Sequence, residues 1–133
     1  MNDAHDRSER PVVLVVEDNE ANLRYLEFIL KKLKLNVLSA SNGEEAINAM
    51  KNENVDCMLL DINLGPGMSG IMLMEIFRKE KRFEVLPINA ITAYYGGGLS
   101  KELIKKGFTD YLTKPFTLEQ LKDMLTKYFD IND

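Results

Sequence analysis

Three carboxylates occupy places in this sequence where they could bind a metal ion together. Glu17 and Asp18 follow the apolar run VVLVV, and Asp61 follows the apolar run CMLL. If the fold brings these acids together, they repel one another and raise each other's pKa until a cation neutralises them. Oxygen ligands select a hard cation, and a small carboxylate set completed by water suits Mg²⁺, with Mn²⁺ as the alternative ion. These residues therefore predict a divalent metal site.

Further residues that could do chemistry stand directly after two other short runs. Thr92 and Ala93 follow INAI, and Lys114 and Pro115 follow DYLT. Each such residue, taken alone, is more simply explained as a solvated turn residue or a helix cap. Because the same pattern recurs after several runs, it favours one shared site over separate turns.

Five short runs are predicted to be the strands of one sheet. Three of them, VVLVV, CMLL and INAI, are almost continuously apolar, as expected for parallel strands covered on both faces. Asn89 is the polar exception within these runs, and the sequence offers no reason for it. The predicted strands are Val12–Val16, Asn36–Ala40, Val55–Leu60, Leu86–Thr92 and Asp110–Thr113.

Helix signals lie between the predicted strands. Ser41 with Glu44, and Thr117 with Gln120, have the spacing of a capping box ahead of an amphipathic stretch. Ser100 is predicted to cap a further short helix. Strands and helices are thus expected to alternate along the whole chain.

Five βα units with short connections predict an α/β fold, a three-layer (βα)5 doubly wound parallel sheet. Right-handed crossovers favour the flavodoxin-like strand order 2-1-3-4-5. Residues 11–130 are predicted to form this domain, after a disordered lead-in at 1–10 and before a tail at 131–133. Ligands of such sheets bind beyond the carboxyl ends of the strands, where the polar residues stand.

Composition excludes several classes of function. The formal net charge of −4 argues against nucleic acid as the main ligand, since phosphate contacts require clustered Lys and Arg. No apolar run approaches the ~20 residues of a membrane helix, so no membrane partner is expected. The lone Cys57 cannot form an internal disulfide, and we expect a cytoplasmic protein.

The motifs VVEDN, LLDIN, GPGMSG, ITA and YLTKPF, in this order, resemble the receiver domains of two-component response regulators. The resemblance runs from Pro11 to about Phe129. It implies that Asp61 accepts a phosphoryl group from a histidine kinase or a phosphotransfer protein. His5, the only histidine, stands in the predicted lead-in, so the phosphodonor is expected to be another molecule.

The resemblance also implies a metal site and a switch. Asp18 would bind Mg²⁺ directly, Glu17 directly or through water, and the backbone carbonyl of Asn63 would complete the protein's ligands. Phosphoryl transfer depends mainly on positioning and charge stabilisation. Lys114 and Thr92 would supply these by each holding a phosphoryl oxygen.

Four residues have supporting roles in this interpretation. Tyr111 would turn inward with Thr92 on activation and so change the partner-binding face. Asn63 and Tyr94 would flank the phosphoryl group, where Tyr94 is expected to slow hydrolysis by covering the approach of water. Lys114-Pro115 resembles a peptide bond that is cis in the family. The loop that follows Asp61 is one residue longer than the usual family pattern.

Three alternatives compete with this interpretation, in which the chain is a phosphoacceptor and not an enzyme that acts on other substrates. An aspartyl-phosphate hydrolase would carry a second acid two residues after its nucleophile, where Asn63 stands. A nucleotide or flavin module would carry a Walker A or Gly-rich loop after the first strand. A pseudo-receiver, a protein-interaction module that takes no phosphate, would usually lack an acid or the lysine. The chain is expected to be a stand-alone receiver, which Met1 favours over a fragment of a longer regulator or hybrid kinase.

Overall fold

A computed structural model describes residues 10–65, 67–94 and 96–131. Its five strands are parallel and form one sheet in the order β2-β1-β3-β4-β5, so the predicted strand order is confirmed. The third and fourth strands begin two residues later than predicted, and the third includes Asp61. The strands are β1 (Val12–Val16), β2 (Asn36–Ala40), β3 (Cys57–Asp61), β4 (Ile88–Thr92) and β5 (Asp110–Thr113).

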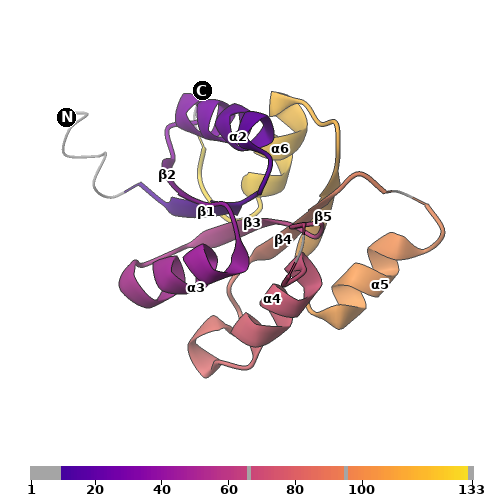
Figure 1. Cartoon of the computed structure of the whole chain (residues 1–133). Coiled ribbons are helices and arrows are strands. Elements are labelled where there is room, and N and C mark those ends of the chain that lie inside the picture. Colours follow the sequence, from indigo (N-terminus) through magenta and orange to yellow (C-terminus); the bar gives the residue numbers. More distant parts are fainter. Residues whose placement is uncertain (1–9, 66, 95, 132–133) are drawn as a thin grey trace.

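Helices cover both faces of the sheet, which confirms the three-layer architecture (Figure 1). Helices α2 and α6 pack on one face, and α3, α4 and α5 pack on the other. None of the helices in the described residues is both long and apolar enough to cross a membrane. The helices are α2 (Glu20–Lys32), α3 (Gly43–Asn52), α4 (Gly70–Arg78), α5 (Leu99–Lys106) and α6 (Leu118–Leu125), with a short 3-10 helix η1 (Lys81–Phe83).

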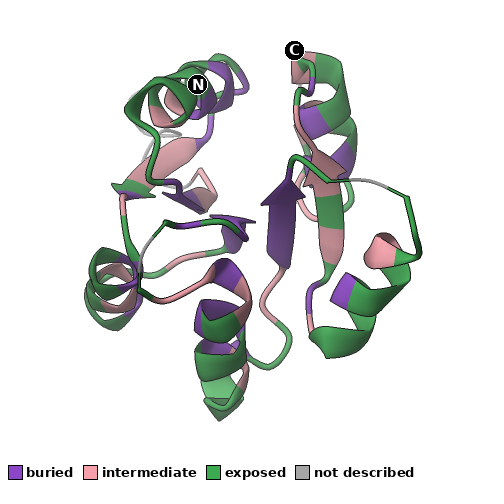
Figure 2. Cartoon of the chain, turned by 45° about the vertical axis from the view of Figure 1, so that its right-hand side comes forward, coloured by how far each residue is buried: buried purple, intermediate pink, exposed green. Residues whose placement is uncertain are grey.

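Two separate apolar clusters form the core because successive side chains of a strand point to opposite faces. In β1, Val13 and Val15 pack under α2 and α6, whereas Leu14 and Val16 pack under the other three helices. Every residue of β3 and β4 is buried. Figure 2 shows this contrast between the buried central strands and the exposed outer faces of the helices.

The buried Asn89 is explained by a polar network that the sequence did not indicate. Its amide nitrogen lies 3.3 Å from both the carbonyl of Met58 and the sulfur of Cys57. Its side-chain oxygen accepts a hydrogen bond of 2.6 Å from the hydroxyl of Tyr128. Asn89 is therefore satisfied in the core, and burial raises the pKa of the Cys57 thiol to about 12, which fits a packing residue.

One predicted capping box is confirmed and the other is wrong by one residue. The Thr117 hydroxyl and the Gln120 side chain cap the start of α6 reciprocally. At α3, however, the cap is Asn42, whose side chain accepts from the amide of Glu45. Ser41 hydrogen-bonds to the Glu45 side chain rather than pairing with Glu44. Two adjacent residues can each cap a helix, so sequence spacing alone did not distinguish them.

The N-terminal end of α5 differs from the prediction. The helix begins at Leu99 after Gly98, which has no side chain to cap it, and Ser100 lies inside the helix. Gly96, Gly97 and Gly98 all have positive φ angles, of 85°, 61° and 78°. Such angles cost glycine little and other residues more, so this connection depends on the glycine run.

The C-terminal end of α5 is held by Arg78 at the end of α4. The Arg78 guanidinium donates to the carbonyls of Phe83 and Leu86 at 2.7 Å and to that of Gly107 at 2.9 Å. It also donates to the hydroxyl of Thr109 at 3.1 Å. Arg78 therefore joins α4 to the end of η1, to the segment after η1, and to the turn between α5 and β5.

The first residue of α4 lies against the end of β3. A Cβ atom added to Gly70 would lie 2.2 Å from the carbonyl oxygen of Asp61 and 2.6 Å from the Cα of Ile62. Neither backbone atom can move without shifting the strand end. The absence of a side chain at Gly70 thus allows α4 to begin directly beside Asp61.

We expect Gly70→Ala to lower the free energy of unfolding by at least about 2 kcal/mol, because overpacking against backbone cannot be relieved by a rotamer change. Urea unfolding would measure this loss. Gly43→Ala is the matched control at the first residue of α3, where the added Cβ would meet side chains and no backbone, the flexible Met68 at 3.0 Å and Leu73 at 3.7 Å. That variant should be neutral or more stable, by up to about 1 kcal/mol, and equal losses in the two variants would contradict the explanation.

Candidate functional site

The carboxyl ends of the strands meet at one rim of the sheet. Val16 lies opposite Leu60 in the pairing of β1 with β3, so Glu17 and Asp18 emerge beside Asp61. One carboxylate oxygen from each of these three residues lies within 4.8 Å of the others. The structure therefore brings together the acids that the sequence singled out, in an arrangement that could hold a metal ion.

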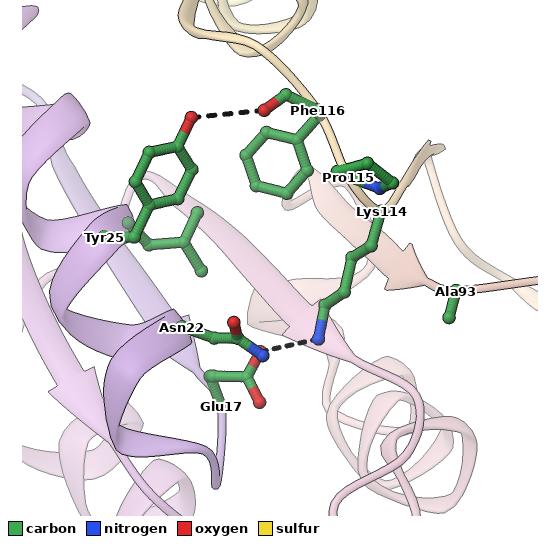
Figure 3. Close-up of a pocket in the computed structure, with 8 residues that line it drawn as sticks. Glu17, Asn22, Tyr25, Ala93, Lys114, Pro115 and Phe116 are labelled. Atoms are coloured by element: carbon green, nitrogen blue, oxygen red, sulfur yellow. Dashed lines mark hydrogen bonds and ion pairs between the residues drawn. The ribbon is translucent and has the colours of Figure 1, made fainter.

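Lys114 joins this acidic cluster from the end of β5. Its ammonium nitrogen lies 2.8 Å from Oε1 of Glu17 and 2.9 Å from Oδ2 of Asp61. The side chains of Glu17 and Asp61 are only 1% and 6% exposed, and that of Lys114 is 23% exposed. Lys114 is thus a shared cation between two buried carboxylates, and Figure 3 shows its side chain reaching towards Glu17.

The electrostatics of the cluster favour a further cation. Burial, and after it the nearby carboxyl of Asp61, raises the pKa of Glu17. Partial burial alone would lower the pKa of Lys114, but its hydrogen bonds to Glu17 and Asp61 outweigh this effect and raise it. With Asp18, the cluster has three carboxylates, and the single ammonium of Lys114 offsets only one of them. Carboxylate oxygens are the ligands that a hard divalent ion prefers. The donor set thus fits Mg²⁺.

Backbone groups fix the orientation of the acids. The amide of Asn19 donates to Oε2 of Glu17 at 3.2 Å, and the amide of Asn63 donates to Oδ1 of Asp61 at 2.8 Å. A Cβ atom added to Gly65 would lie 2.9 Å from Oδ2 of Asp18, so the lengthened loop passes directly beside that acid. The metal-binding role of the Asn63 carbonyl stays a prediction.

Thr92 and Tyr94 lie at the end of β4, next to β3. Thr92 is fully buried, and its hydroxyl accepts a hydrogen bond of 3.0 Å from the amide of Tyr94. The side chain of Tyr94 is 64% exposed. The predicted shielding by Tyr94 therefore does not rest on tight packing in this structure, and it stays a prediction.

Tyr111 lies away from the acidic cluster. It stands opposite Ala90 in the pairing of β4 with β5, and it is 37% exposed. Together with Ile104 of α5 it lines a shallow depression on the surface. The structure thus describes Tyr111 in an outward position, which is the starting state that the predicted switch requires.

A pocket of about 480 Å³ opens beside Lys114 (Figure 3). Pro115 and Phe116 form one wall and Tyr25 of α2 forms another. The Lys114-Pro115 peptide bond is cis. Tyr25 was missed by sequence reasoning, because nothing in a single sequence links α2 to a residue 91 positions away.

Comparisons with known proteins agree with this architecture. The family described as "Response regulator receiver domain" matches residues 13–126. The chain is 36% identical over 124 residues to the sensor histidine kinase GacS of Pseudomonas protegens. It is 32% identical over 116 residues to the histidine kinase BarA of Escherichia coli K12. These alignments include 91% and 87% of this chain but only 13% and 12% of the two kinases.

Solved structures give the same result. The chemotaxis protein CheY4 of Vibrio cholerae superposes with a TM-score of 0.83 at 25% identity, covering 90% of this chain and 99% of CheY4. The receiver domain of the sensor histidine kinase PA1611 of Pseudomonas aeruginosa superposes with a TM-score of 0.81 at 28% identity, covering 90% and 97%. That domain was solved with a magnesium ion coordinated in its active-site cleft.

We expect Mg²⁺ to stabilise the folded protein, because an ion that binds only the native state shifts unfolding by mass action. At 100 times its dissociation constant, Mg²⁺ should add about 2.7 kcal/mol, measured by urea unfolding with and without the ion. Asp18→Asn should weaken this effect, whereas Glu44→Gln, which removes an exposed carboxylate from α3, should not. A stability indifferent to Mg²⁺ would contradict the site.

Proposed function

The chain belongs to the response regulator receiver domain family, and from this premise we propose that it accepts a phosphoryl group on Asp61 in a two-component phosphorelay. The donor would be a histidine kinase or a histidine phosphotransfer protein. The observation that carries the proposal is the ammonium of Lys114 between Glu17 and Asp61. This arrangement places a positive charge beside the carboxylate that would become the nucleophile.

In the proposed transfer, a carboxylate oxygen of Asp61 attacks the phosphorus of the donor's phosphohistidine. The bond from phosphorus to the imidazole nitrogen breaks, and that nitrogen keeps the electron pair. An acyl phosphate forms on Asp61. The single histidine of this chain, His5, stands in the predicted lead-in ahead of the domain, so we assign the donor to another protein.

Other residues would stabilise the negative charge that is transferred. Lys114 would exchange Asp61 for a phosphoryl oxygen and keep its ion pair with Glu17. The Thr92 hydroxyl accepts from the amide of Tyr94, which leaves its own proton to donate to a second phosphoryl oxygen. A magnesium ion held by Glu17, Asp18 and Asp61 would supply further positive charge to the phosphoryl group.

The alternatives have less support. A pseudo-receiver that takes no phosphate would not need the three acids and the lysine, which here converge on one rim. A hydrolase acting on other phosphate esters would need a proton donor near Asp61, where this chain has Asn63. We therefore propose a signalling domain whose chemistry is confined to its own phosphorylation and dephosphorylation. We also propose a cytoplasmic location, because Cys57 is a free, buried thiol and the cytoplasm is a reducing compartment.

The protein context is also a proposal. The chain spans only 12–14% of the length of the first curated relatives, so their sensing and kinase activities are not transferred to it. We propose that a protein partner reads the phosphorylated state through the surface around Tyr111, and that neither nucleic acid nor membrane is a direct ligand.

Asp61→Asn should abolish phosphorylation, because it preserves the side-chain shape and removes the nucleophile. Intact mass measured after incubation with acetyl phosphate and Mg²⁺ should show one added phosphoryl group on the wild type and none on the variant. Asp56→Asn is the matched control, an aspartate just before the same strand, and should be phosphorylated normally. One phosphoryl group on Asp61→Asn at the wild-type rate would show that another residue is the acceptor.

Phosphorylation should also move Tyr111 from its exposed position. Thr92 would turn towards the phosphoryl group, and Tyr111 would then pack into the space beside β4, driven by the difference in contacts between the two states. Structures with and without beryllofluoride, a phosphoryl mimic, would reveal the change. The side chain of Tyr111 should become less exposed than 37%, while that of Tyr25 stays near 45%. The same Tyr111 rotamer in both structures would refute the switch.

A further inference from the structure

Tyr25 connects α2 to the loop that carries Lys114. Its hydroxyl donates a hydrogen bond of 3.2 Å to the carbonyl oxygen of Phe116. The two rings also lie side by side, with centroids 6.1 Å apart and planes at 47°. Figure 3 shows both contacts on the wall of the pocket opposite the end of Lys114. Tyr25 is therefore attached to the loop two residues beyond the lysine.

The loop from Lys114 to Thr117 is held at three places. The amide of Lys114 donates to the carbonyl of Thr92 at 2.7 Å, which fixes the loop to β4. Thr117 is fixed by the capping box of α6. Between these two points, the hydrogen bond from Tyr25 holds Phe116 to α2. Loss of this middle attachment would free the loop between its two ends.

The side chain of Lys114 has little other support. It lines the 480 Å³ pocket, so neighbouring atoms do not pack closely against that side of it. Its ammonium is held by Glu17 and Asp61, and the second of these contacts would be exchanged for the phosphoryl group during transfer. The backbone from which the side chain extends is then a main determinant of its position.

We infer that Tyr25 is a positioning residue for phosphorylation: its hydroxyl fixes the loop so that Lys114 meets the incoming phosphoryl group. This inference rests on the proposed function and adds a residue to it. Tyr25 itself would touch neither the metal ion nor the reacting atoms.

The test compares Tyr25→Phe, which keeps the ring and removes the hydroxyl, with wild type. The rate of phosphorylation by acetyl phosphate at saturating Mg²⁺ should fall about three- to tenfold, the effect of one lost hydrogen bond expressed fully in the barrier. The Mg²⁺ concentration for half-maximal rate should stay the same, because Tyr25 does not contact the acids. An unchanged rate would overturn the inference.

Tyr128→Phe is the matched control, since it also removes a tyrosine hydroxyl that donates a hydrogen bond, here to Asn89. It should lower the stability of the fold and leave the phosphorylation rate unchanged. A rate that falls equally in both variants would mean that Tyr25 acts only through stability, and the inference would be wrong.

A double-mutant cycle tests whether Tyr25 acts through Lys114. Lys114→Ala should slow phosphorylation strongly, and adding Tyr25→Phe in that background should slow it no further. An equal additional loss in both backgrounds would show that Tyr25 acts by another route and would overturn the inference.

Hydrogen exchange tests whether Tyr25 holds the loop of Lys114, and this test does not depend on the proposed function. The amide of Lys114 should exchange faster in Tyr25→Phe relative to the amides of β3, because the loop opens locally. In Tyr128→Phe, the exchange rates of the Lys114 amide and of the β3 amides should change together. If wild type takes up no phosphoryl group, the proposed function is wrong, and faster local exchange would then show only that Tyr25 fixes the loop that carries Lys114. Unchanged exchange of the Lys114 amide would overturn the inference.

Discussion

The structure depends most on the shared cation between Glu17 and Asp61. Both acids are almost fully buried, and a buried charge without a partner costs several kcal/mol. Lys114 offsets this cost only because three strand ends converge at one rim and a short loop directs its side chain inwards. In the proposed transfer, the same cation would change partners from Asp61 to a phosphoryl oxygen without losing contact with Glu17. One group would then provide both stability and a charge for the reaction.

The layers and the strand order could be predicted from sequence because they follow from strong, local signals. Continuous apolar runs are satisfied only by strands covered on both sides, and the rules for connecting them leave few topologies. Once the strand ends are known, the convergence of Glu17, Asp18 and Asp61 follows from the parallel arrangement. The acidic cluster was predictable for the same reason as the fold.

The features that sequence did not predict are contacts between distant segments. Tyr25 and Phe116, Asn89 and Tyr128, and the contacts of Arg78 with α5 each join segments whose approach depends on the finished packing. No periodicity marks such residues, since each is a single side chain that meets backbone or one polar partner. The start of α5 was missed for a different reason. The residue before this helix is Gly98, which has no capping side chain, and a nearby serine gave a misleading signal.

The two ends of α5 are held to different degrees. Hydrogen bonds from Arg78 clamp the turn after its C-terminal end, while its N-terminal end follows three successive glycines in left-handed conformations. A rigid helix that is held at one end moves more at its other end. We therefore expect any displacement of α5 to be larger near Leu99, the end closer along the chain to Thr92, than near Lys106. A single arginine on a neighbouring helix thus decides which end of α5 is held.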